Sequence, residues 1–227
     1  MAIPSNWPVG TYLDTLGPVA QTALLGLGVP KLFRRGDVIM RESERSDYVV
    51  VLVQALVKVT ETLGNGRVAL LNIKVGGDVV GEMAFLSGEP RSATVTACVD
   101  TRARVVASAQ FQRFLGEHPE ANLALTRMIM KTLRWNQQRR VDVNGYSAVV
   151  RLARVLNHLA DAYGRPGPYG VTLKLGLTQG ELGSLVGVEE DTARRELRVL
   201  RDRGVISMGY RAITIVDLDV LAEVACA

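Results

Sequence analysis

The chain has 227 residues, 48% of them hydrophobic, and a formal net charge of +4. That is enough for one large domain or two ordinary ones, and it permits nucleic-acid binding. The two cysteines, Cys98 and Cys226, exclude an iron–sulfur cluster held by four thiolates of one chain, and the two histidines have no metal-type spacing. The neutral, proline-broken start and the lack of a run of about 18 apolar residues predict a cytoplasmic protein without a membrane partner.

Residues 1–30 predict helical and loop segments that cover the adjoining strand-rich region. From about residue 32 to 108 the hydrophobic period changes to two, and turn signals such as Gly64-Asn65-Gly66 separate short β-rich runs. Short strands at this spacing are typical of a sandwich or a β-roll. The predicted strands are residues 38–40, 48–53, 56–62, 68–73, 79–80, 93–98 and 103–107.

The residues between the predicted strands 79–80 and 93–98 indicate a cradle for one small phosphate diester. Gly81 lets a backbone approach a ligand closely because it has no Cβ, and a helical turn over 83–86 directs free N–H groups at an anion. Arg91 offers a planar fork for two phosphate oxygens and Ser92 one more donor, whereas Glu82 suits a ribose 2′-hydroxyl. The alternative is an ordinary glycine-rich hairpin with Arg91 as a solvated surface charge. The ordered set resembles the phosphate-binding cassette of cyclic-nucleotide-binding domains.

Residues 109–143 predict helix, with a long segment that contains no further glycine or proline after Pro119. Its wide apolar stripe needs a partner, either a second copy of itself in a coiled-coil-like dimer or its own β-roll. Arg139-Arg140 is interpreted as a solvated helix end. Val141–Tyr146, with the turn signal Asn144-Gly145, is predicted to break the helix and form the hinge between domains.

Residues 177–206 predict a helix-turn-helix. Thr178 and Glu181 have the spacing of a capping box, a Gly187 turn ends the first helix, and a second helix runs from about 189 to Asp202. A β-hairpin wing is expected over 205–216.

One face of the second predicted helix is rich in arginine. Four arginines fall within an arc of roughly 120° when residues are placed at about 100° each, and they can meet phosphates and guanine edges in a major groove. They are Arg194, Arg195, Arg198 and Arg201. The alternative is a solvated, salt-bridged surface, because four acidic residues lie nearby.

Both constellations together, in this order, resemble the cyclic AMP receptor protein / fumarate-nitrate regulator (CRP/FNR) family of bacterial transcription factors over essentially the whole chain. The resemblance implies that the cyclic phosphate and ribose are held by Gly81, Glu82, Met83, Ala84, Arg91 and Ser92. It implies a dimerisation helix from about residue 119 to 141 and a recognition helix over 189–202. The DNA-contacting positions that the motif implies are Thr178, Gln179, Glu190, Asp191, Thr192, Arg194, Arg195, Arg198 and Arg211.

Two features of the chain, at three positions, depart from the family pattern. Asn136 and Gln137 stand where the family's cyclic AMP sensors carry hydroxyl residues that hydrogen-bond the adenine, and amides need not prefer adenine. Glu190 stands where the family has a base-reading arginine, so a guanine contact is lost and a cytosine N4 contact becomes available. Arg195 matches the family's other base-reading arginine, and we therefore expect an unusual operator.

The resemblance implies an α+β protein with an N-terminal cyclic-nucleotide-binding β-roll (1–118), a dimerisation helix (119–143) and a C-terminal winged helix-turn-helix (144–227). We expect a homodimeric transcription regulator that binds a palindromic DNA operator and cyclic AMP or another cyclic nucleotide, with RNA polymerase as a further candidate partner. One alternative is the same regulator with a degenerate pocket that takes another effector or none. Another is a nucleotide-sensing regulatory subunit without DNA binding. No catalytic constellation stands out, so an enzyme is not expected.

Overall fold

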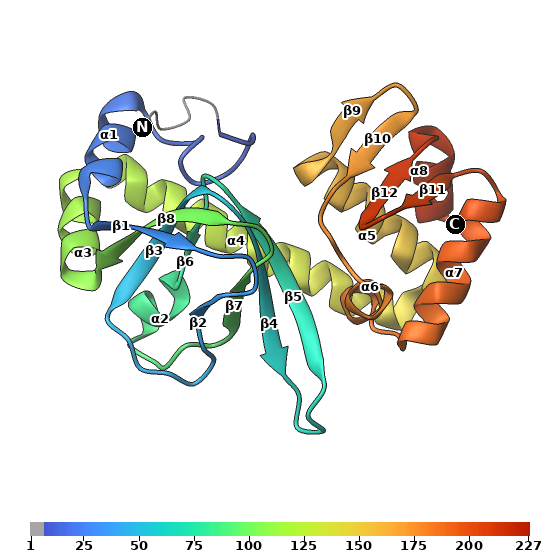
Figure 1. The fold of residues 1–227 in the computed structure, drawn as a ribbon, viewed down its shortest axis with the longest axis horizontal. Helices are drawn as coiled ribbons and strands as arrows, with labels where there is room; N and C mark the ends of the chain where they lie inside the picture. The colour runs from blue at the N-terminus through green and yellow to red at the C-terminus, as the bar shows by residue number, and fades with distance from the viewer. Residues whose placement is uncertain (1–6) are drawn as a thin grey trace. The chain divides into compact units, whose positions relative to one another are not determined.

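The computed structural model describes residues 7–227, and the chain divides into two compact units, 1–132 and 133–227. The elements of the first unit run from a short helix through two groups of strands to a second helical region (Figure 1). They are α1 (Pro18–Gly26), β1 (Val29–Phe33), β2 (Val38–Met40), β3 (Tyr48–Gln54), β4 (Leu56–Thr62), β5 (Val68–Val75), β6 (Val79–Val80), α2 (Glu82–Ser87), β7 (Thr94–Ala97), β8 (Thr101–Ala107) and α3 (Ser108–Glu117). A long helix, α4 (Pro119–Gly145), runs through the boundary between the units.

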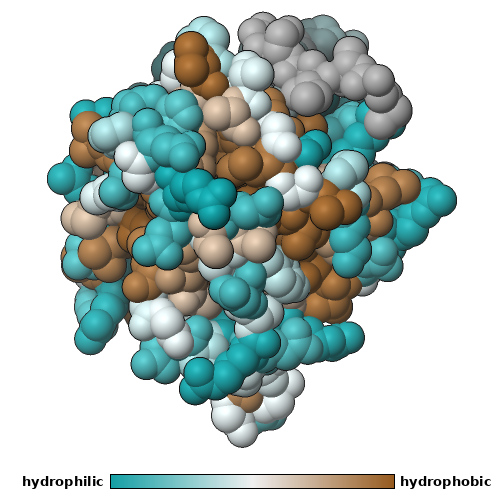
Figure 2. All heavy atoms as spheres, turned by 90° about the vertical axis from the view of Figure 1, so that its left-hand side faces the viewer, coloured by the Kyte–Doolittle hydropathy of each residue, from teal (hydrophilic) through white to brown (hydrophobic). Residues whose placement is uncertain are grey.

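The strands of the first unit form two four-stranded antiparallel sheets, β1-β8-β3-β6 and β2-β7-β4-β5. Buried valines and other apolar residues from both sheets meet in one core, which makes the arrangement a β-roll. A second core lies on the other face of the first sheet, under α1, α3 and the start of α4. Figure 2 looks onto the α1 and α3 side of this unit, where apolar and hydrophilic side chains intermix.

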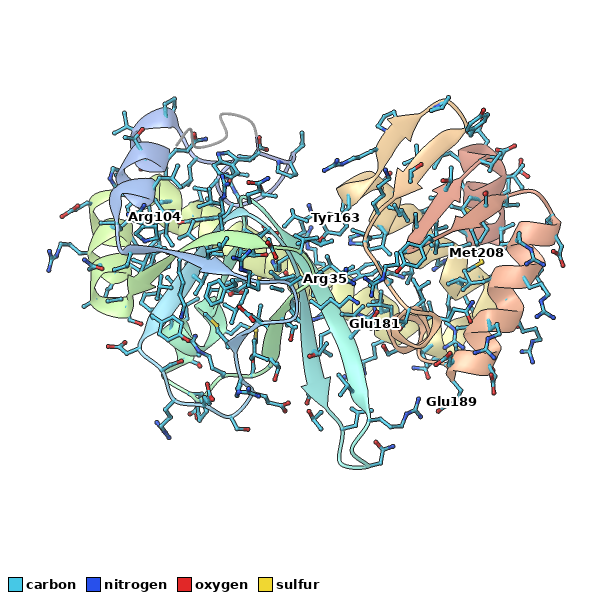
Figure 3. The ribbon with its side chains drawn as sticks, viewed as in Figure 1. Arg35, Arg104, Tyr163, Glu181, Glu189 and Met208 are labelled. Atoms are coloured by element: carbon cyan, nitrogen blue, oxygen red, sulfur yellow. The ribbon has the colours of Figure 1, made fainter. Side chains whose placement is uncertain are left out.

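One local turn and one long-range contact fix the connections of the roll. Gly66 has a φ of +80° and its N–H donates to the carbonyl oxygen of Leu63, so the predicted hairpin between β4 and β5 is confirmed. The guanidinium of Arg104 on β8 donates hydrogen bonds to the carbonyl oxygens of residues 26–28, which fixes the connection between α1 and β1 (Figure 3). The strand β1 lies where the sequence indicated only the end of a helical region.

The second unit is a winged helix-turn-helix whose helices pack on a four-stranded sheet of order β11-β12-β10-β9. Leucines from three helices fill its core, among them Leu156, Leu182 and Leu197. Its elements are α5 (Ala148–Tyr163), β9 (Arg165–Gly167), β10 (Gly170–Leu173), α6 (Gln179–Val186), α7 (Glu190–Asp202), β11 (Ile206–Gly209), β12 (Ala212–Ile215) and α8 (Leu218–Cys226). The strand β9 and the helix α8 had no clear signal in the sequence.

The prediction that Val141–Tyr146 breaks the long helix is wrong, because α4 continues to Gly145. Tertiary contacts hold this part of α4. Asp142 accepts a hydrogen bond of 2.8 Å from Arg154, whose guanidinium also lies 3.6 Å from the centre of the Tyr146 ring. The local turn signal of Asn144-Gly145 therefore marks the end of the helix rather than an interruption of it.

The interpretation of Arg139 as a solvated helix end is also wrong. Its Nε donates a 2.8 Å hydrogen bond to the carbonyl oxygen of Leu185, and burial lowers the pKa of the guanidinium. One turn earlier, the Trp135 ring stacks on the His158 ring with centroids 3.7 Å apart. These contacts attach the second half of α4 to the helix-turn-helix. Within residues 7–227, no helix is long and apolar enough to cross a membrane.

We predict that Leu197→Ala lowers the free energy of unfolding of the second unit by about 2–5 kcal/mol, because the side chain is fully buried and its removal leaves a cavity. Val199→Ala on the same helix is the matched control, since Val199 is 39% exposed, and it should change stability by less than about 1 kcal/mol. Urea denaturation followed by circular dichroism measures both. Equal losses in the two variants would contradict the assigned core.

Candidate effector pocket and nucleic-acid interface

Gly81 begins the predicted phosphate cradle and has a conformation that other residues rarely adopt. It caps α2 with a φ of +87°. A Cβ at this position would lie 2.5 Å from Nη1 of Arg91 and 2.7 Å from Cε of Met40. Glycine suits this backbone conformation, and a larger residue here would also have to displace the ends of the Arg91 and Met40 side chains.

Arg91 lies inside the β-roll and is only 4% exposed. Its Nη1 donates to the carbonyl oxygen of Gly81 at 2.9 Å, its Nε donates to Oγ of Ser46 at 2.7 Å, and its Nη2 donates to the carbonyl oxygen of Tyr48. Burial lowers the pKa of this guanidinium. The alternative interpretation of Arg91 as a solvated surface charge is therefore wrong. A guanidinium has five N–H donors, so donors remain for a ligand.

The next residues of the cradle are open to solvent. Ser92 is exposed, and its Oγ lies 3.8 Å from Sδ of Met83, which is itself 55% exposed. Ala84, half-buried on α2, lines a pocket of about 490 Å³ together with Ser46 and residues of α3, but the other predicted cradle residues do not line this pocket. The structure thus brings the predicted cradle residues of the first unit together around the start of α2.

Glu82 is half-buried at the first position of α2. Burial raises the pKa of its carboxyl group, and the Asp78 carboxylate raises it further, whereas the charges of Lys74 and Arg91 lower it. Lys74 was not recognised in the sequence as a site residue. The signal was available, because Lys74 is a charged residue near the end of a strand, 68–75, that otherwise reads as half-buried and apolar.

The two residues expected to read the base lie on α4. Asn136 and Gln137 are both exposed, and both belong to the second unit. The same helix carries exposed apolar side chains at Leu123, Met130, Leu133, Val141 and Val143, which are 50%, 44%, 45%, 59% and 47% exposed. At about 100° per residue Leu123, Met130 and Val141 fall within roughly 20° of one another and form a narrow stripe, whereas Leu133 and Val143 lie on other faces of α4.

The helix-turn-helix forms as predicted. The Thr178 hydroxyl accepts from the backbone N–H of Glu181 at 3.1 Å, and the Glu181 carboxylate accepts from the backbone N–H of Thr178 at 2.7 Å, which confirms the capping box. Gly187 ends α6 with a φ of +69°. Ala193, Leu197 and Leu200 are buried on the inner face of α7, so its arginines face outward.

Most of these arginines bind acidic neighbours. Arg194 donates to Gln179 at 2.8 Å, to Glu190 at 2.9 Å and to Asp191 at 3.0 Å. Two others match the salt-bridged alternative, because Arg195 pairs with Glu196 and Arg201 pairs with Asp202. Arg198 is exposed and has no ion pair with any described residue.

The wing adds one more basic residue. Arg211 stands at the turn between β11 and β12 with a φ of +54°, and its guanidinium lies 5.9 Å from the ring of Tyr210, which is 92% exposed. Arg211 lines a pocket of about 230 Å³ together with Thr178 and Gln179, so three predicted DNA-contacting residues meet at one place. Thr192 is half-buried on α7. Tyr210 had not been singled out in the sequence.

No group of three or more His, Cys, Asp or Glu side chains in the described part of the chain could hold a metal ion.

We predict that Arg91→Leu lowers the free energy of unfolding of the β-roll by about 2 kcal/mol or more, because it leaves buried carbonyl oxygens without donors. Arg102→Leu on the exposed side of β8 is the matched control and should cost less than about 0.5 kcal/mol. Urea denaturation of both variants measures the difference. If Arg91→Leu were as stable as the control, the guanidinium would contribute nothing to the roll.

Comparison with known proteins identifies both units. The cyclic nucleotide-binding domain model matches residues 30–118, and the Crp-like helix-turn-helix domain model matches residues 150–224. A CRP-like cAMP-activated global transcriptional regulator of Mycobacterium tuberculosis is 27% identical over 206 residues, which cover 91% of this chain and 92% of that protein. The nitrogen fixation regulation protein FixK of Azorhizobium caulinodans is also 27% identical, over 91% of this chain and 84% of that protein.

Solved structures show the same fold. FixK2 from Bradyrhizobium japonicum superposes with a TM-score of 0.76 at 22% identity, covering 88% of this chain and 98% of that chain. A CooA mutant from Carboxydothermus hydrogenoformans gives a TM-score of 0.74 at 18% identity, over 99% of this chain and 98% of that chain. With a cyclic nucleotide-binding domain ahead of a Crp-like helix-turn-helix, and with relatives along nearly its full length, the chain belongs to the CRP/FNR family of transcription regulators.

Proposed function

We propose that this regulator binds a cyclic mononucleotide, cyclic AMP first, and that the ligand controls DNA binding by a homodimer in the cytoplasm. The observation that carries the proposal is the geometry around Gly81, where a buried arginine, a glycine in the left-handed region and an exposed serine lie close to one place. A singly charged phosphate diester suits these donors. When ionised, Glu82 is an acceptor only, and it suits the ribose 2′-hydroxyl.

The chemistry expected at the base does not single out adenine, because Asn136 and Gln137 offer amides where the family's cyclic AMP sensors have hydroxyls. An amide can donate to and accept from a purine edge, and it fits guanine as well as adenine. The Mycobacterium tuberculosis relative is described as cAMP-activated, which favours cyclic AMP. The equally similar FixK is described only as a nitrogen fixation regulation protein. The second candidate is therefore the same DNA-binding regulator with another effector or none.

The exposed stripe on α4 supports a homodimer. Leu123, Met130 and Val141 lie at intervals of about seven and eleven residues, and such a stripe is self-complementary when two copies of the helix meet around a two-fold axis. A dimer also fits a palindromic operator, because two recognition helices must enter major grooves one DNA turn apart.

Ligand control is then a two-state equilibrium. The contacts of Trp135 and Arg139 attach the second half of α4 to the helix-turn-helix, so we place the pivot near residues 132–133 rather than at 141–146. The ligand favours one arrangement only by its difference in affinity for the two states. RNA polymerase is the partner through which a bound regulator would act on transcription.

The recognition helix supports an operator with cytosine or adenine amino groups at the positions nearest its start. Arg194 binds Glu190 and Asp191, so it holds two carboxylates at this end of α7 instead of reading a base itself. Carboxylates accept from cytosine N4, and Arg195 and Arg198 remain the residues that reach guanine or phosphate.

We predict that cyclic AMP or cyclic GMP binds with a micromolar Kd and that Ser92→Ala weakens this binding about tenfold, because a hydrogen bond to a charged phosphate is lost. Isothermal titration calorimetry measures both nucleotides. Ser87→Ala is the matched control at the other end of α2, where Ser87 accepts from the N–H of Glu89. If neither cyclic AMP nor cyclic GMP binds, the nucleotide proposal is rejected and the second candidate remains.

We predict that Arg195→Ala reduces discrimination between the selected operator and random DNA by about tenfold or more, since a bidentate base contact is worth about 1–3 kcal/mol. Selection from a random duplex pool supplies the operator, and fluorescence anisotropy measures affinity. Arg203→Ala, exposed beyond the end of α7, is the control. Unchanged discrimination would remove Arg195 from the base-reading set, and failure to bind any duplex would favour a regulatory subunit without DNA binding.

A further inference from the structure

The segment between β2 and β3 holds both the backbone and the side chain of Arg91. The N–H of Ser43 donates to the carbonyl oxygen of Arg91 at 2.8 Å, and the N–H of Arg91 donates to the carbonyl oxygen of Glu44 at 2.9 Å. Further along, Nε of Arg91 donates to Oγ of Ser46 at 2.7 Å, and its Nη2 donates to the carbonyl oxygen of Tyr48. These four residues therefore form a clamp around one arginine, and we call them the Arg91 clamp.

The backbone of the clamp adopts a conformation that serine rarely takes. Ser43 has a φ of +66°, which lies in the left-handed region. A residue in this region costs free energy and persists only where surrounding contacts impose it, and such residues cluster at ligand-binding sites. The N–H of Ser43 is one of the donors that hold Arg91, so the strained residue belongs to the contact that positions the arginine.

Ser46 supplies the only acceptor of the Arg91 guanidinium that depends on the identity of a side chain. Gly81 and Tyr48 accept through backbone carbonyl oxygens, whereas Ser46 accepts through its hydroxyl. Three acceptors on three different nitrogens fix the orientation of a planar group. Because Arg91 is only 4% exposed, an Nε that lost the Ser46 hydroxyl would have little access to water as a substitute.

The same hydrogen bonds determine which donors of Arg91 remain for a ligand. A guanidinium has one N–H on Nε and two on each terminal nitrogen. Ser46 takes the single donor of Nε, and the two carbonyl oxygens take one donor each from Nη1 and Nη2. One donor is left on each terminal nitrogen, so the terminal edge of the guanidinium is the part that can bind a phosphate oxygen.

We propose that Ser46 is a positioning residue that orients Arg91, so that the pocket distinguishes the two exocyclic oxygens of a cyclic phosphate. The proposal rests on the proposed binding of a cyclic nucleotide. Ser46 acts only through Arg91, because it engages Nε and thereby leaves the terminal nitrogens for the ligand. Without the Ser46 hydroxyl, the guanidinium can rotate and offer Nε as well, and its preference for one oxygen weakens.

The test uses the Rp and Sp phosphorothioate diastereomers of cyclic AMP and, in parallel, those of cyclic GMP. In each diastereomer sulfur replaces one of the two exocyclic oxygens, and sulfur is a weaker hydrogen-bond acceptor than oxygen. Isothermal titration calorimetry of the wild-type protein should show that one diastereomer binds about tenfold or more weakly than the other. In Ser46→Ala we expect the affinity for the parent nucleotide to fall about three- to tenfold and the ratio between the diastereomers to fall several-fold.

Two further variants serve as controls. Ser46→Thr keeps the hydroxyl and should retain both the affinity and the ratio between the diastereomers. Ser108→Ala is the matched control, because Ser108 is half-buried and lines the same pocket as Ser46, but its hydroxyl makes no hydrogen bond to Arg91. Ser108→Ala should therefore leave both quantities unchanged.

The outcomes separate the role of Ser46 from the nucleotide site itself. A wild-type protein that binds neither parent nucleotide rejects both. If a parent nucleotide binds but Ser46→Ala changes nothing, or weakens both diastereomers equally, the site stands and the role of Ser46 is overturned. If Ser46→Ala does not fold, the wild-type protein still decides, because equal binding of the two diastereomers would contradict an oriented Arg91. In the Arg91→Lys background, a further change of the ratio by Ser46→Ala would show that Ser46 does not act through the guanidinium.

Discussion

The hydrogen bonds of the Arg91 guanidinium are the constraint on which the ligand-binding half of the molecule depends. They connect Gly81 at the start of α2, Ser46 in the loop before β3 and the backbone of Tyr48 on β3. Two segments distant in sequence, residues 46–48 and the start of α2, are thereby held around one positive charge. The same guanidinium packs where a Cβ of residue 81 would lie, so the glycine and the arginine require each other.

Compensation of charge is common to the two sites. In the β-roll, burial raises the pKa of the Glu82 carboxyl group, and the charges of Lys74 and Arg91 lower it. On α7, Arg194 forms ion pairs with Glu190 and Asp191. In both places a cation of the protein acts on an acid of the protein.

Local patterns were enough to predict the elements whose structure is decided locally. The capping box at Thr178, the glycine turn at Gly187 and the β4–β5 hairpin depend on residues within a few positions of each other. The end of α4 could not be predicted in this way, because contacts of Asp142 with α5 outweigh the local turn signal. The burial of Arg91 and of Lys74 could not be predicted from local patterns either, since both depend on which strands lie opposite each other.

These contacts also limit how a signal can pass from ligand to DNA. The second half of α4 carries Asn136 and Gln137, and the same segment is attached to the helix-turn-helix through Trp135, Arg139 and Asp142. Under the proposed function, a ligand that engages these amides acts on a segment already joined to the helix-turn-helix. The coupling free energy is the difference in ligand affinity between two positions of that segment, and DNA must alter ligand affinity by the same factor.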